Sequence, residues 1–242
     1  MSLVSIFKID NVDSLEEIVN KIDKKKASGG TFYAQKSKYS DAEAFIQYWY
    51  MEDVENCVKR GFTENEADEI SILLRQNGKE KVSRKIYCFI NLITGTLEIY
   101  RWKDNRTDEL ISAFEVLLGS KISPISIKPE ALKKLYSNNA VELSQVMFKN
   151  IDGLTYDILR GKYLENNQKA MDYVQRFLES LRVVSFRPNI RFLNGNNKYQ
   201  ITINGDKGTV RFSDQENGFT SRPRFEVRQI TFMIASVLGG LD

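Results

Sequence analysis

Apolar and polar residues alternate along much of the chain with the two-residue period of a pleated strand. The signal is clearest around 94–95 and 204–208, where a glycine-containing turn separates two short alternating runs, as in a β-hairpin. On this pattern we predict strands at residues 2–9, 85–93, 96–102, 141–149, 183–192, 199–204 and 209–212.

Helical spacing and capping residues predict helices between these strands. Ser40 with Glu43, and Thr63 with Glu66, have the spacing of a capping box, in which each side chain bonds the other residue's backbone N–H. Pro129 is placed where the first turn of a helix accepts proline. The predicted helices lie at about 14–26, 40–61, 63–77, 107–118, 129–135, 164–181 and 226–238.

The two halves of the chain resemble each other. Residues 87–119 run hairpin, apolar helix, glycine, and residues 199–239 repeat that order. We therefore predict an α+β fold built by tandem duplication of strand–helix–β-hairpin–helix units, with an antiparallel sheet and helices on one face. The first half spans 1–125, with a helical insertion at about 40–77, and the second spans 140–242. The alternative is coincidence, because hairpins followed by helices are common.

Composition places the chain among globular proteins. Apolar residues make up 42% and charged residues 28%, which is enough apolar content to fill a core at a length of 242 residues. No apolar run approaches the roughly 20 residues that cross a bilayer, and the first residues lack the pattern of a signal peptide. Two cysteines form no disulfide framework or metal motif. We expect a cytoplasmic protein without a membrane partner.

The chain contains no histidine, which bears directly on catalysis. Histidine is the commonest general base and a usual zinc ligand, so its absence removes the Ser-His and Cys-His nucleophile pairs. The acidic residues at 64–69 fall in the first turns of a predicted helix, where they favour the helix dipole without needing a metal. No Walker loop or dinucleotide fingerprint is present. We therefore favour a binding protein over an enzyme and expect no metal or other cofactor.

Residues 180–212 form the one strongly basic stretch, with six basic residues and a single acid, Asp206. Strand alternation places the polar members of this stretch on one face, without a carboxylate. Lysine and arginine neutralise phosphates, and amides bond base edges and sugars. The predicted DNA- or RNA-binding residues are Arg187, Arg191, Lys198, Gln200 and Arg211.

Other interpretations of this basic face remain open. An antiparallel sheet often leaves one face in solvent, and the arginines could pair with acids elsewhere in the chain, such as those at 64–69. The competing function is a protein-interaction or assembly module that docks an acidic partner, and a histidine-free enzyme comes third. Steep weakening by salt would distinguish nucleic acid from a protein partner.

The aromatic residues between 32 and 50 offer a second candidate surface, since bases stack on aromatic rings. The helical spacing of Phe45 and Trp49 favours the core instead, and Tyr33 and Tyr39 are the better candidates for exposure. The residues that we predict to be buried are Phe45, Trp49, Val54, Ile70, Leu73, Phe114, Leu117, Phe186, Ile201, Val210 and Phe232.

Overall fold

The computed structural model describes residues 2–59, 62–101, 106–151, 153–188, 199–213 and 225–238. Its first half contains β1 (Ser2–Ile9), α1 (Leu15–Ile22), β2 (Lys26–Ala27), β3 (Gly30–Lys36), β4 (Glu43–Asp53), α2 (Val54–Val58), α3 (Glu64–Gln76), β5 (Lys81–Asn91), β6 (Thr96–Arg101) and α4 (Thr107–Leu118). Its second half contains β7 (Ile122–Pro124), α5 (Pro129–Asn139), β8 (Ala140–Ile151), β9 (Leu154–Arg160), the 3-10 turn η1 (Leu164–Asn166), α6 (Gln168–Arg176), the 3-10 turn η2 (Leu178–Ser180), β10 (Leu181–Pro188), β11 (Gln200–Asn204), β12 (Thr209–Ser213) and α7 (Phe225–Leu238).

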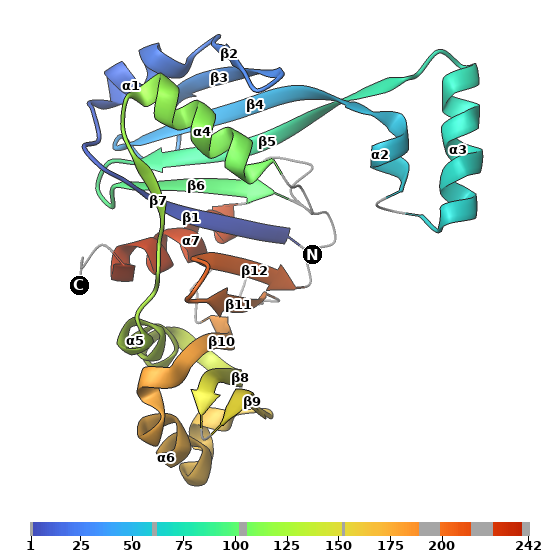
Figure 1. The fold of residues 1–242 in the computed structure, drawn as a ribbon. Helices are drawn as coiled ribbons and strands as arrows, with labels where there is room; N and C mark the ends of the chain where they lie inside the picture. Colours follow the sequence, from blue (N-terminus) through green and yellow to red (C-terminus); the bar gives the residue numbers. More distant parts are fainter. Residues whose placement is uncertain are drawn as a thin grey trace.

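These strands form one antiparallel sheet. Its order is β2-β3-β4-β5-β6-β1-β12-β11-β10-β8-β9, and β7 pairs with the end of β1. The N-terminal strand β1 therefore lies at the centre, between the hairpins β5–β6 and β11–β12 (Figure 1). The predicted mixture of helices with a large antiparallel sheet is confirmed, and β1 begins and ends at the predicted residues.

The face of the sheet that packs against α1 and α4 is called the front face here. Helix α1 buries Leu15, Ile18 and Ile22, which lie on one side at helical spacing, and a capping box between Ser14 and Glu17 fixes its start. Strands β3 to β6 and the end of β1 contribute the rest of this core. The described core on the front face ends near β1, and its members all precede residue 123.

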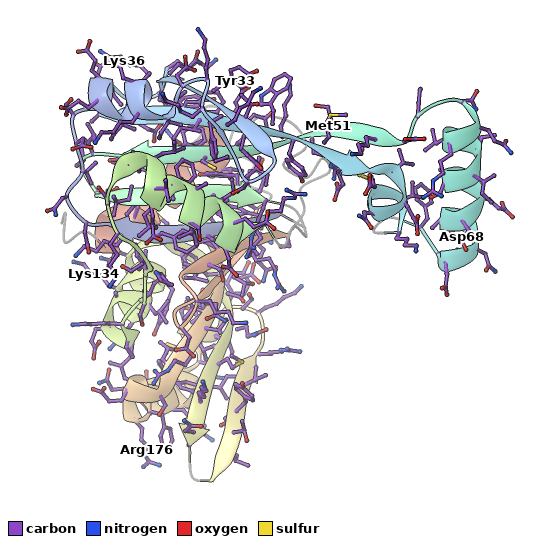
Figure 2. The ribbon with its side chains drawn as sticks, turned by 45° about the horizontal axis from the view of Figure 1, so that its top comes forward. Tyr33, Lys36, Met51, Asp68, Lys134 and Arg176 are labelled. Carbon is purple, nitrogen blue, oxygen red and sulfur yellow. The ribbon has the colours of Figure 1, made fainter. Side chains whose placement is uncertain are left out.

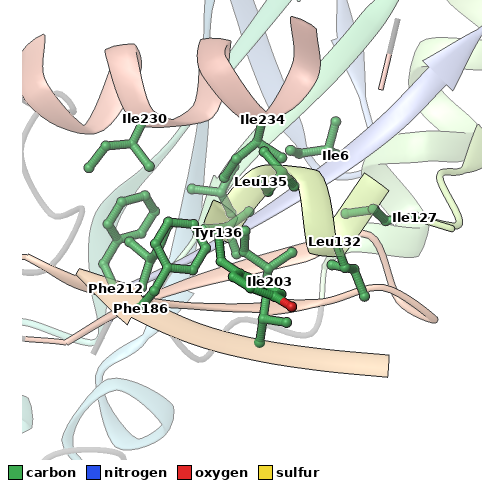
Figure 3. Close-up of a cluster of buried hydrophobic side chains, with 14 of the residues drawn as sticks. Ile6, Ile127, Leu132, Leu135, Tyr136, Phe186, Ile203, Phe212, Ile230 and Ile234 are labelled. Atoms are coloured by element: carbon green, nitrogen blue, oxygen red, sulfur yellow. The ribbon is translucent and has the colours of Figure 1, made fainter. Parts of the chain in front are cut away.

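The opposite, back face packs against α5, α6 and α7. Ile230 and Ile234 of α7 lie over Phe186 and Phe212 of the second half (Figure 3). The same cluster includes Phe89 and other back-face residues of β4, β5 and β6, so α7 spans the junction between the two halves. The back-face core is therefore shared by both halves of the chain.

Helices thus cover both faces of the sheet, and the predicted placement on one face is wrong. Neighbouring residues of β4 show the reason. Ala44 and Ile46 belong to the cluster under α1 and α4, whereas Phe45 belongs to the cluster under α7. A strand whose two faces are both buried reads as a continuous apolar run, and its pattern does not say which helix covers which face.

The helix predicted at 40–61 is a strand for most of its length. Ser40 accepts a hydrogen bond from the Ala42 backbone and does not cap a helix, and Glu43 turns inward to Arg228. The sequence from 43 to 53 is rich in aromatic residues, which pack well on a pleated surface and override the coincidental helical spacing. Among the described residues of this interval, 40–59, α2 at Val54–Val58 is the only helix.

Strands β4 and β5 extend beyond the body as a long hairpin that carries α2 and α3 at its end. Figure 2 shows this arm standing clear of the sheet, with Met51 on the ribbon and Asp68 on α3. A small separate cluster holds the tip together, formed by Val54, Val58 and Ala67. The predicted capping box of α3 is confirmed, since Glu66 accepts hydrogen bonds from the backbone and hydroxyl of Thr63.

The predictions for residues 154–181 and for the buried core are confirmed only in part. The helix predicted at 164–181 is divided into η1, α6 and η2, and the strand β9 was not predicted. Among the residues predicted to be buried, Trp49, Leu73 and Phe232 are exposed and Ile70 and Leu117 are half-buried, whereas the others are buried. Within the described residues, no helix is long and apolar enough to span a membrane.

Candidate nucleic-acid interface

A row of side chains runs across the front face from the edge strand β9 to β6. Strand register places each member directly across from the next. Directly opposed residues on antiparallel strands share a face, and neighbouring strands are about 4.8 Å apart. The row is therefore one surface with arginines at both ends and one between, and no carboxylate. Its members, in order, are Arg160, Gln145, Ser185, Thr202, Arg211, Leu3 and Arg101.

The part of the front face over β8 to β12 is called the open face here. The front-face core under α1 and α4 includes no residue of these strands, although Val183 and Ser185 of β10 are buried on this face. Arg160, Arg187 and Arg211 are all exposed on it. Alternate residues of the same strands, such as Ile201 and Val210, are fully buried on the back face.

Arg211 lies in the row, between Thr202 of β11 and Leu3 of β1. Arg187 lies on the same face of β10, two residues beyond Ser185, and its Nη1 is 3.7 Å from Oε2 of Glu142. The Arg187 side chain is 49% exposed in this ion pair, whereas that of Glu142 is 14% exposed.

Hydrogen bonds hold the uncharged members of the open face in place. Ser185 and Thr202 share a hydrogen bond of 2.8 Å between their hydroxyl oxygens. Gln200 is half-buried and donates to the hydroxyl of Ser144, which donates in turn to the Ser185 carbonyl, at 3.0 Å. The side-chain amide of Gln200 is consequently already hydrogen-bonded within the sheet. Gln145, in the row, is therefore the better candidate for the hydrogen bonds to bases or sugars that were predicted for Gln200.

Two of the predicted binding residues, Arg191 and Lys198, lie outside the described residues. Two further polar side chains, Arg160 and Gln145, lie in the row. Gln145 belongs to the predicted strand β8 but was not among the predicted binding residues, and Arg160 belongs to β9, which was not predicted as a strand. The alternation of Tyr156, Ile158 and Arg160 on the front face was the signal that could have identified that strand.

Apolar side chains border the row on its outer side. Tyr156 and Ile158 of β9 are 52% and 40% exposed, and they face the same way as Arg160, at the spacing of alternate strand residues. Lys149 lies across from Tyr156 on β8. The outer end of the open face therefore combines an aromatic ring with two basic residues.

The predicted aromatic surface is only partly present. The ring centroids of Tyr33 and Trp49 lie 5.7 Å apart on the back face of β3 and β4, and both side chains are exposed. Lys85 Nζ lies 3.8 Å from the centroid of the Trp49 ring and so covers one of its faces. Phe32, Tyr48 and Tyr50 are core residues, and Tyr39 is half-buried.

A buried ionic cluster joins α7 to strands β4 and β6 of the sheet. The guanidinium of Arg228 bonds both Glu43 of β4 and Glu98 of β6 and also donates to the Tyr100 hydroxyl, at 2.7 Å. The Arg228 guanidinium also lies 3.6 Å from the centroid of the Phe89 ring. Two carboxylates thus surround one cation in a site where all three side chains are at most 5% exposed.

Burial also shifts the pKa of two side chains in this cluster, Glu43 and Tyr100. Burial raises the pKa of Glu43 above its ordinary value, although Arg228 acts in the opposite direction. Burial likewise raises the pKa of Tyr100 well above its ordinary value. Because Glu43 and Arg228 are 185 residues apart in the chain, no local pattern could have revealed the cluster.

Comparison with known protein families gave no matching family, and comparison with curated proteins gave no match either.

Proposed function

We propose that the protein binds single-stranded DNA or RNA on its open face, without catalysing a reaction. The observation that carries this proposal is the cross-strand row of arginines and neutral polar side chains, which contains no carboxylate. Arg160 and Arg211 would contact phosphates, and Gln145 and Thr202 would bond sugars or base edges.

The shape of the surface favours a single strand over a duplex. A broad sheet face presents side chains to a strand laid across it, whereas reading a duplex requires an element that enters a groove. The exposed ring of Tyr156 supplies a stacking surface at the outer end, and stacking on an aromatic side chain requires unpaired bases. Arg160 and Arg211 lie four β-strands apart in the sheet, or roughly 19 Å. A single-stranded nucleic acid that contacts both arginines would therefore have several nucleotides between the two contacts.

The test is fluorescence anisotropy with labelled single-stranded DNA, single-stranded RNA and duplex DNA over a series of salt concentrations. The double variant Arg160→Ala/Arg211→Ala should bind single strands more weakly. The slope of log affinity against log salt should fall by about 0.7 for each phosphate contact removed. Both residues are exposed, so the fold should be unaffected and far-ultraviolet circular dichroism unchanged.

The matched control is Lys169→Ala/Arg176→Ala on α6, which changes the net charge equally. Helix α6 packs against the back face, and Arg176 lies on it away from the open face (Figure 2). Equal loss of affinity in the two double variants would mean that net charge alone attracts the nucleic acid, which would refute a site on the open face. Displacement of the oligonucleotide by polyglutamate of equal charge would favour an acidic protein partner instead.

We also propose that the two halves arose by duplication, as the sequence suggested. The support is a symmetry in the sheet order, in which the hairpins β5–β6 and β11–β12 flank β1 and each leads into a helix, α4 or α7. A rotation by half a turn about an axis along β1 would place β5–β6 on β11–β12 with each strand running in the same direction. The same rotation would exchange the front and back faces of the sheet. Duplicated helices would then lie on opposite faces, as α4 and α7 do.

A further inference from the structure

Helix α3 uses only one side to hold the tip of the arm together. Ala67 and Ser71 are buried, and Ile70 and Leu74 pack beside them against α2 and Val82. These four residues recur every three or four positions, so they form one stripe. The stripe attaches α3 to the rest of the arm. The opposite side of α3 therefore faces away from α2 and β5.

That outward side carries large apolar residues. Ile72 and Leu73 are 55% and 60% exposed, and with Met51 they are the most exposed of the large apolar side chains on the described part of the arm. Asp68 and Glu69 lie one helical turn before them and are also exposed. We call Asp68, Glu69, Ile72 and Leu73 the outer face of α3. Two adjacent aliphatic side chains in solvent at the end of a projecting arm suit a contact surface.

Charges along α3 make this surface complementary to itself. The first half of the helix is acidic, and Arg75 follows the aliphatic pair. Arg75 and Asp68 are two turns apart on the same flank of the helix. If a second α3 is laid antiparallel across the first, Arg75 of each copy approaches Asp68 of the other, and the aliphatic pairs meet between them. A parallel arrangement would bring acid to acid.

We propose that the outer face of α3 binds the same face of a second copy of this chain, as an antiparallel helix pair about a two-fold axis. An isologous contact of this kind closes on itself and produces a dimer, not a filament. The arm holds α3 away from the body, so the two sheets need not collide when the tips meet (Figure 1). This proposal does not depend on nucleic-acid binding.

The small surface area that two such helices can bury indicates a weak dimer. One pair of short helices buries well under the roughly 1,200 Å² of a standard stable interface, so the dimer is weak and reversible. Arg75 already bonds Glu55, at 2.6 Å, and its guanidinium has further donors for Asp68 of a second copy. Dimerisation should therefore depend on concentration and weaken as salt rises.

Sedimentation velocity over about 1 to 200 µM protein tests the proposal, since mass action shifts a weak dimer across that range. The wild-type chain should sediment as a monomer at the lowest concentration and increasingly as a dimer at the highest. Leu73→Asp should remain a monomer throughout, because it places a charge between the aliphatic pairs. Asp68→Lys should dimerise less than the wild type, because the introduced ammonium group would then face Arg75 of the second copy.

The matched control is Val116→Asp, an equivalent change at a residue of α4 that is 83% exposed. This variant should dimerise as the wild type does, and circular dichroism should show that all variants are folded. A wild-type chain that stays monomeric at about 200 µM would overturn the proposal. So would a Leu73→Asp variant that dimerises normally, or a Val116→Asp variant that does not. A stronger dimer in Asp68→Lys would overturn the antiparallel arrangement.

Discussion

The two halves of the sheet are built from similar strands but are covered differently. In the first half, most of β4, β5 and β6 is buried on both sides, by α1 and α4 in front and by α7 behind, although Trp49 and Met51 of β4 are exposed. In the second half, most apolar residues of β10 to β12 pack behind, and Arg187 and Arg211 are exposed on the open face. A polar residue therefore has opposite consequences in the two halves. Glu98 on β6 is buried against a cation, whereas Arg211 on β12 is exposed to water.

This comparison separates two uses of charge. In the covered half, Glu43, Glu98 and Arg228 join a helix to the sheet, and removal of one member leaves the others buried without compensation. In the open half, Arg160, Arg187 and Arg211 are exposed, so water solvates them and burial imposes no comparable cost. Burial, and not residue type, therefore decides how strongly a charged side chain affects the stability of the fold.

The largest expected effect comes from Arg228→Met. It removes the only cation in the described cluster and leaves two buried carboxylates, which should lower the free energy of unfolding by about 3–5 kcal/mol. Urea denaturation followed by circular dichroism measures the change. The same substitution at Arg211 should shift stability by less than about 0.5 kcal/mol. Similar losses at both positions would break the distinction between the two halves.

A second pair of variants compares the two faces within the open half. Ile201→Ala should cost about 2–5 kcal/mol, because Ile201 is fully buried in the core behind β11. Arg187→Ala on the neighbouring strand should cost less than about 0.5 kcal/mol, since its ion pair with Glu142 is half-exposed. Thermal unfolding of both variants would show the difference. A large loss for Arg187→Ala would mean that the open face is covered.

The smallest effect concerns pH and Glu43. Because the pKa of Glu43 is raised in the folded protein, the protonated carboxyl stabilises the fold. This contribution is complete below the ordinary pKa of glutamate and is lost as the pH rises through the raised folded value. Within that window the wild type should lose up to about 1.4 kcal/mol per pH unit relative to Glu43→Gln, which cannot titrate. Parallel pH profiles for the two proteins would show that Glu43 titrates normally.

Local patterns predicted many of the elements. The capping box of α3, the terminal glycine of α4 and proline at the start of α5 each act over a few residues. The alternation in β10 to β12 identified the outward position of Arg187 and Arg211. Such signals depend on neighbours in the chain, so the sequence contains them in full.

The prediction at β4 failed for a physical reason. Phe45 and Trp49 lie four residues apart, which suits a helix, yet β4 pairs with β3 and β5 along its length. Pairing on both sides and burial on both faces outweigh a local spacing that is only suggestive. Likewise, Arg160 could not be assigned to the basic face before β9 was known to pair with β8.

The sequence by itself determined where charge and apolar residues alternate, and thus which side chains share a face of each strand. Only the tertiary structure decided what covers each face, because helices α4 and α7 reach their positions through contacts between distant segments. The meeting of Arg228 with Glu43 and Glu98 depends on that packing, since desolvation acts only once the chain has closed around the charges. The row from Arg160 to Arg211 likewise depends on strand order, which the alternation within each strand does not specify.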